Sequence, residues 1–309
     1  MFLIILFITI IISLVFPQPG NIMHQMGFIS PLCIFIMYFA LGFSAEFKSI
    51  KLALKKIKTT IVIQIAIFVI APLIALLLYS IFSQFVDPKS IIGILFIGAV
   101  PTTMTSCIML TRQYGGDDIL ALCNAMLSQI LGVIITPLIL LFFLQSNYIN
   151  VASFSSVINK LFVQVMIPFI MGQILSQFYN SDKIIQIAKK ITFYGIFPLI
   201  YISVAQVVAK GNFKNILLNG YYPIIICILF AIFQILVTQL LGKGFNFSRK
   251  EKITLLFTAA QKTMGLGIPL VLMYFPNNSE YSTNIIFMFL IYYILSLLIV
   301  SSYAKFLNK

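Results

Sequence analysis

Ten long apolar segments constrain the possible folds of this chain more than any other feature. Most of them approach or exceed the roughly 17–25 residues that a helix needs to cross a bilayer. Charged residues make up only 9% of the 309 residues, against about 25% in soluble domains. The sequence therefore predicts an all-α polytopic membrane protein with ten transmembrane helices, whose approximate bounds are Phe2–Phe16, Phe28–Phe47, Thr59–Phe85, Ser90–Thr111, Asp118–Leu144, Ser153–Phe178, Ile184–Ala209, Tyr221–Gly242, Ile253–Phe275 and Ser282–Phe306.

Basic residues gather in alternate loops, which indicates the orientation in the bilayer. Fifteen of the 20 basic residues fall on one side, including Lys48, Lys51, Lys55, Lys56 and Lys58 before the third segment. By the positive-inside rule, both termini are cytoplasmic. The net charge of +13 is then a topology signal, and no nucleic-acid partner is expected. The high Ile, Lys and Asn content suggests an AT-rich bacterial genome, and hence the cytoplasmic (inner) membrane.

The ten segments divide into two sets of five, at residues 1–150 and 151–309. An odd number of spans per half places the second half upside down, as in the inverted repeats of many secondary transporters. The fourth segment contains VPTTMTSC (Val100–Cys107), and the ninth, its counterpart, contains AQKTMGLGIP (Ala260–Pro269). A matched pair of polar, interrupted helices predicts a binding site near the middle of the membrane.

The ninth segment carries the one charged side chain that we expect at membrane depth, Lys262. Burying a lysine there costs about 2.5–3.5 kcal/mol on insertion scales, so such residues usually face a protein interior and have a function. The alternative is a side chain that extends to the membrane surface. Polar neighbours and predicted helix-breaking residues surround the lysine, namely Gln261, Thr263, Gly265, Gly267 and Pro269.

The fourth and fifth segments supply further polar side chains for the same site. Pro101 is expected to interrupt the fourth helix, and four hydroxyls follow it at Thr102, Thr103, Thr105 and Ser106. Hydroxyls can bind small cations or polar groups of a substrate, although they can also bond to their own helix. The fifth segment adds Asn124, Ser128 and Gln129, which should face inward and bind either the solute or neighbouring helices.

No residue pattern in the chain indicates catalysis or a resident metal. The four cysteines fall in apolar segments without metal-ligand spacing. Asp117 and Asp118 open the fifth helix, where we expect them to act as caps. The protein is therefore predicted not to be an enzyme and to have no cofactor, with Na⁺ as a candidate coupling ion only.

Two stretches resemble a known family. PTTMTSCIMLTRQYGGDDILALCNAMLSQILGVIITP (Pro101–Pro137) and SRKEKITLLFTAAQKTMGLGIP (Ser248–Pro269) are similar to the bile acid:sodium symporter superfamily, and within it to the sodium/bile acid cotransporter 7-like branch. The resemblance implies ten helices arranged as a panel domain and a core domain. It also implies that the broken fourth and ninth helices cross at the substrate site.

The same resemblance assigns roles to individual residues. Ser106 and Cys107 match a Ser-Asn pair that helps to bind sodium in the bile-acid branch. Gln261 and Lys262 match the last two residues of its Glu-x-Gly-x-Gln-Asn pattern, whose glutamate holds both sodium ions. Phe257 falls near the position of that glutamate, which has no counterpart here. A fixed ammonium would repel a sodium ion about 4 Å away by roughly 4 kcal/mol at an effective dielectric of about 20.

These observations favour a secondary active transporter that moves a small organic anion by alternating access. Lys262 either stands in for a bound cation or binds the anion directly. Because burial disfavours the charged form of an amine, a proton could also replace sodium as the coupling ion. Two alternatives stay open: a cation/proton antiporter, and a regulatory membrane protein linked to ion homeostasis that transports little. Besides the lipid bilayer and the solute, the sequence indicates no partner.

Overall fold

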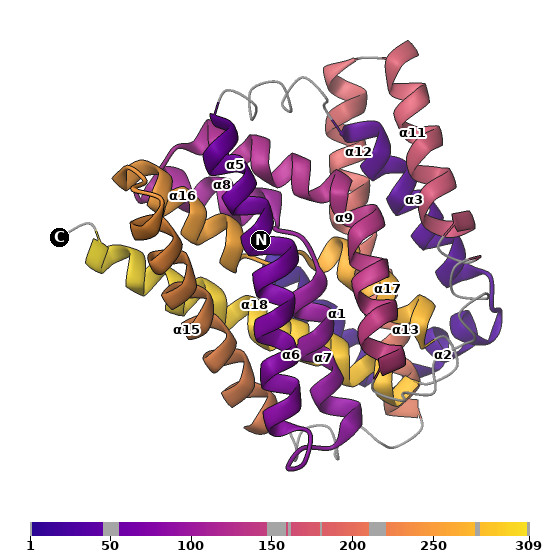
Figure 1. Cartoon of the computed structure of the whole chain (residues 1–309). Coiled ribbons are helices and arrows are strands. Elements are labelled where there is room, and N and C mark those ends of the chain that lie inside the picture. The colour runs from indigo at the N-terminus through magenta and orange to yellow at the C-terminus, as the bar shows by residue number, and fades with distance from the viewer. Residues whose placement is uncertain are drawn as a thin grey trace. The chain divides into compact units, whose positions relative to one another are not determined.

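The computed structural model describes residues 2–45, 56–146, 159, 162–179, 181–209, 221–275 and 279–307, and these ranges are almost entirely helical (Figure 1). Within them, five helices or helix series are long and apolar enough to cross a membrane. They are α5–η2–α6 (Ile57–Ile65, Ala66–Ile70, Ala71–Phe82), α9 (Asp118–Ser146), α12–α13 (Asp182–Tyr194, Ile196–Ala209), α15 (Tyr221–Gly244) and α18 (Ser279–Leu307). The predicted all-helical, polytopic class is confirmed.

The remaining apolar segments form shorter helices: α3 (Ile29–Ser44), α7 (Pro88–Ala99), η3–α11 (Phe162–Met166, Ile167–Phe178) and α17 (Met264–Tyr274). Near the N-terminus, α1 (Phe2–Val15) and α2 (Pro17–Gln25) meet at an angle of 89°. The chain bends at Phe16 because Pro17 starts a new helix, at a position where proline is favoured. The count of ten spans and their inverted symmetry stay predictions.

The chain forms two compact units, each assembled from both halves of the sequence. Unit 1 comprises Met1–Ala45, Tyr148–Gly220 and Gly267–Ile286, and unit 2 comprises Glu46–Asn147, Tyr221–Leu266 and Phe287–Lys309. The predicted boundary between residues 150 and 151 separates two repeats along the sequence, and it does not separate the two compact units. That boundary, like Lys48, Lys51 and Lys55, lies outside the described residues.

Unit 1 is held together by close approach of α3 and α11. A Cβ atom added at Gly42 would meet the backbone of Phe169, and one added at Gly172 would meet the backbone of Phe39. These two glycines therefore let the helix backbones touch, as small residues do in membrane helix pairs. Elsewhere in the unit, the Tyr201 hydroxyl on α13 donates to the carbonyl of Phe16 at 2.8 Å, at the bend after α1.

Unit 2 contains both of the predicted interruptions, whereas α17 continues from Gly267 as part of unit 1. The fourth segment forms α7 and then α8 (Met104–Gln113), and the ninth forms α16 (Arg249–Ala260) and then α17. The second interruption lies before the residues that were predicted to break the helix. The backbone is extended at Gln261 (φ −82°, ψ 115°) and is helical again from Met264. Gly265, Gly267 and Pro269 therefore lie inside α17, where Pro269 removes a single helical donor.

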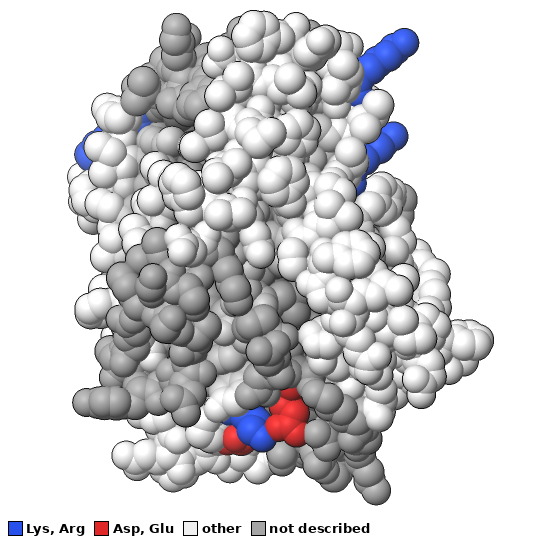
Figure 2. Space-filling view, turned by 90° about the vertical axis from the view of Figure 1, so that its right-hand side faces the viewer, with Lys and Arg blue, Asp and Glu red and all other residues white. Residues whose placement is uncertain are grey.

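The outer surface carries large apolar side chains, as expected for a chain in lipid. Phe85, Phe142 and Phe178 are 67%, 71% and 76% exposed. In the face shown by Figure 2, the described atoms are nearly all uncharged. Charged side chains that would be costly in hydrocarbon are scarce there.

Candidate functional site

The two interruptions meet within unit 2. Thr102 and Lys262 form an isolated antiparallel β-bridge. The amide of Thr103 donates to the carbonyl of Gln261 at 3.2 Å, and the amide of Thr263 donates to the carbonyl of Pro101 at 2.9 Å. The extended residues of one break therefore satisfy the backbone groups of the other.

Proline chemistry explains where α7 ends. Pro101 has no N–H group and disfavours helical geometry at the residue before it, and Val100 is extended (φ −76°, ψ 150°). The last carbonyls of a helix lack intrahelical partners and need other donors when they are buried. Side chains of α9 supply two such donors at the break. Thr136 Oγ1 donates to Ala99, the last residue of α7, at 2.9 Å, and Gln129 Nε2 donates to the extended residue Thr102 at 2.6 Å.

Lys262 Nζ donates to three backbone carbonyls: Val100 at 3.2 Å, Gly98 at 3.4 Å and Ile67 at 3.4 Å. The lysine is only 2% exposed, so its predicted burial is confirmed. The described residues place no carboxylate within ion-pair distance of it. Its amine lies instead at the C-terminus of α7, where the helix dipole favours a cation.

The carbonyl of Ile67 lacks a donor within its own helix because α5–η2–α6 contains a π-helical turn. In this turn the amide of Ala71 bonds to the carbonyl five residues earlier, at Ala66. The next donor in that register would be residue 72, which would bond to Ile67. Residue 72 is a proline, so Ile67 keeps an unused carbonyl that Lys262 takes. Such π-helical turns are frequent at functional sites.

Other predicted site residues surround the crossing. Ser106 Oγ donates to Gln261 Oε1 at 3.3 Å, and Thr263 Oγ1 accepts from the amide of Gly265 at 3.2 Å. Gln261 and Thr102 are fully buried. Gln261 Nε2 has no hydrogen-bond partner among the described residues, whereas the Thr102 hydroxyl bonds to the thiol of Cys107. A buried polar group without a partner is costly, and a ligand bound at the crossing could satisfy Gln261 Nε2. Ser203 and Gln234 carry such atoms on other helices.

The side chains of the remaining predicted residues take less part in the crossing. Thr103 is half-buried, and the Thr105 side chain points outward. Asn124 bonds instead to Gln64 and to the carbonyl of Leu120, and Ser128 bonds to its own helix at Ala125. For Asn124 and Ser128, the bonds present are those of helix packing.

Two side chains that position the crossing were not among the predicted site residues. Thr136 precedes a proline in the sequence, a pattern that could have drawn attention to it. Tyr292, on α18, donates its hydroxyl to the carbonyl of Ala260, the last residue of α16, at 2.6 Å. Its sequence surroundings are uniformly apolar and give no signal.

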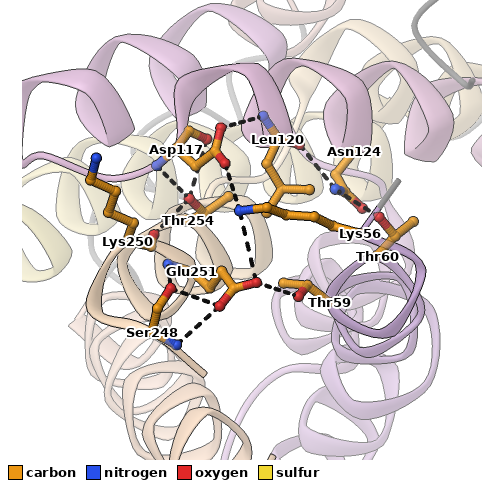
Figure 3. A network of polar contacts seen from close by, with 10 residues as sticks. All are labelled: Lys56, Thr59, Thr60, Asp117, Leu120, Asn124, Ser248, Lys250, Glu251 and Thr254. Carbon is orange, nitrogen blue, oxygen red and sulfur yellow. Dashed lines mark hydrogen bonds and ion pairs between the residues drawn. The ribbon is translucent and has the colours of Figure 1, made fainter. Parts of the chain in front are cut away.

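A second polar cluster joins the start of α5, the α8–α9 turn and the start of α16 (Figure 3). Lys56 Nζ lies 3.0 Å from a carboxylate oxygen of Asp117 and 3.9 Å from one of Glu251. Asp117 also accepts from the amide of Leu120 at 2.9 Å, so its predicted role as a cap is confirmed. The carboxylate of Asp118 instead pairs with Arg112 at 2.6 Å.

Both carboxylates bound to Lys56 have a lowered pKa. Partial burial acts to raise the pKa of Asp117, but hydrogen bonds from Leu120 and Lys56 outweigh it. Burial likewise acts to raise the pKa of Glu251, and hydrogen bonds from Ser248 and Thr59 outweigh it. Ser248 and Glu251 also form a reciprocal capping box at the start of α16.

Two interrupted apolar helices that meet at a buried, polar point are typical of secondary transporters. The comparisons agree with this class: a model of the SBF-like CPA transporter family (DUF4137) matches residues 1–309. The chain belongs to this family, which confirms the resemblance found in the sequence and indicates transport rather than catalysis.

Individual relatives are similar over most of their length. An uncharacterized protein of Pseudomonas aeruginosa is 23% identical over 282 residues, covering 90% of this chain and 84% of that protein. Sodium/bile acid cotransporter 7 of Danio rerio is 24% identical over 279 residues, covering 85% and 81%. The Escherichia coli K12 protein named "Putative symporter YfeH" is 23% identical over 282 residues, covering 90% and 84%.

Proposed function

We propose that this protein is a secondary active transporter for a small organic anion, in which the ammonium of Lys262 takes the place of a bound sodium ion. The observation that carries the proposal is the set of three carbonyl contacts to Lys262 Nζ at the crossing. Carbonyl oxygens are ligands of hard cations, and here they surround a cation that is part of the chain.

The surroundings of the lysine support a stand-in for a cation over direct binding of the anion. All three of its hydrogen bonds go to backbone carbonyls, and 2% of the residue is exposed. A solute would find a polar partner in the neighbouring Gln261 Nε2. Phe257 stands where the bile-acid branch has the glutamate that holds its sodium ions. A sodium ion next to the Lys262 ammonium would therefore be repelled, with no carboxylate to offset the repulsion.

The two other readings have less support. Antiporters of this general design pair an intramembrane acid with their lysine, and the described part of the chain places no carboxylate next to Lys262. A purely regulatory role has less support because the family model that matches the whole chain is one of transporters. The solute therefore binds at the crossing, and the helices move around it in alternating access.

Uptake of radiolabelled organic anions into proteoliposomes tests the proposal. We expect the wild-type protein to accumulate at least one anion against its gradient, and Lys262→Met to lose this uptake by 10-fold or more. Ser80→Ala, which changes an exposed hydroxyl on α6, is the control and should transport normally. Wild-type uptake by Lys262→Met, or no uphill uptake by the wild type across an anion panel, would contradict the proposal.

A further inference from the structure

The cage around Lys262 Nζ is built entirely from backbone. Its oxygens come from Ile67 in η2 and from Gly98 and Val100 at the end of α7. None belongs to the segment that carries the lysine. Each carbonyl is available for a reason that does not involve Lys262: Pro72 offers no N–H group to Ile67, and α7 ends before it can supply donors to the other two. The fold itself therefore holds the three oxygens in place.

The chemistry of the cage indicates which ligand it suits. Three neutral carbonyls at a helix C-terminus favour a single positive charge. A divalent ion would usually require carboxylates, and Ca²⁺ needs contacts of about 2.3–2.6 Å. The separations here, 3.2–3.4 Å from nitrogen to oxygen, are longer and lie at the long end of N–H···O hydrogen bonds. No described carboxylate pairs with the site.

We propose that this cage is a monovalent-cation site for ammonium and primary alkylammonium ions, which the protein fills with its own side chain. The inference rests on the proposed role of Lys262 as a fixed cation and extends it by naming the class of ligand. Truncation of Lys262 to alanine removes Cγ, Cδ, Cε and Nζ, and the removed atoms have the size and shape of n-propylammonium. The emptied site should therefore accept that ion from solution.

Chemical rescue of Lys262→Ala in detergent tests the inference, with the melting temperature (Tm) as the readout. We expect the variant to melt below the wild type and n-propylammonium chloride to raise its Tm saturably, as binding to the folded state requires. Ammonium should act at higher concentrations because it leaves the channel of the missing side chain unfilled. Sodium, choline and 1-propanol should shift the variant no more than they shift the wild type, whose cage is occupied.

Several results would overturn the inference. An equal rise with 1-propanol would mean that an apolar cavity is being filled, and no rise with either amine would mean that the cage does not bind cations. Aggregation of Lys262→Ala both with and without propylammonium during purification would count against it. So would a Tm for Lys262→Met, which fills the volume without charge, equal to that of the wild type. Because no solute is involved, failure here is distinct from failure of the transport proposal.

Discussion

At the scale of single residues, the crossing shows how a helix can be broken inside an apolar protein. The carbonyls of Ala99, Val100 and Thr102 next to the break at Pro101 each accept from a specific side chain, and one of these donors is the amine of Lys262. An unpaired buried carbonyl would cost about 1–3 kcal/mol. The donors from α9 are therefore as much a part of the site as the lysine.

Thr136→Val should destabilise the protein by about 1–3 kcal/mol, because the nearly isosteric change leaves the carbonyl of Ala99 without its donor. The measurement is the Tm or the denaturant midpoint in detergent. Thr238→Val is the matched control, since this buried hydroxyl bonds to its own helix at Ile235 and should cost less. Equal effects of the two changes would contradict the role given to Thr136.

At the scale of elements, α9 packs directly on the break between α7 and α8. A Cβ atom added at Gly132 would lie 2.7 Å from Cγ of Pro101, whose ring cannot move aside freely. The glycine therefore lets α9 approach the break closely enough for Gln129 and Thr136 to donate to the carbonyls there.

Gly132→Ala should lower stability by about 1–3 kcal/mol through overpacking, despite the better helix propensity of alanine. Gly244→Ala is the control, because a Cβ atom there meets nothing within 4 Å. Thermal unfolding of both variants provides the measurement. A Gly132→Ala protein at least as stable as wild type would show that α9 is not held against the break.

The cluster of Lys56, Asp117 and Glu251 should make stability depend on acid pH. Both carboxyls have a lowered pKa in the folded state. Their contribution is therefore complete above the unfolded values, about 4, and is lost as the pH falls through the folded values. We expect Tm to fall below about pH 4 in the wild type and to fall less steeply in Asp117→Asn/Glu251→Gln. Identical pH profiles would contradict this account.

At the scale of the whole molecule, the prediction concerns orientation. Green fluorescent protein fused after the C-terminus should fluoresce, and alkaline phosphatase fused there should be inactive, because the loop charges predict a cytoplasmic C-terminus. Phosphatase fused after Asp87, in the turn before α7, should be active. The opposite pattern would reverse the orientation, and equal signals would challenge the predicted topology.

The sequence predicted the helical class, the family and the meeting of two interrupted helices, because prolines, a lone lysine and clustered hydroxyls are conspicuous in apolar segments. It did not predict that α17 continues through Pro269, since one lost donor is tolerated once a helix is packed. It could not place Thr105 outward, because the helical phase after a break depends on where the helix restarts. The contact of Lys262 with the carbonyl of Ile67 could not be predicted either, because a π-helical turn leaves no clear pattern in the sequence.

The chemical accessibility of Lys262 is the most direct test of this account. Reductive methylation of the native protein in detergent, read residue by residue by mass spectrometry, should modify the exposed Lys58 and Lys243 and leave Lys262 unmodified until the protein is denatured. Modification of Lys262 in the native protein at the rate of those surface lysines would contradict the caged ammonium on which both proposals depend.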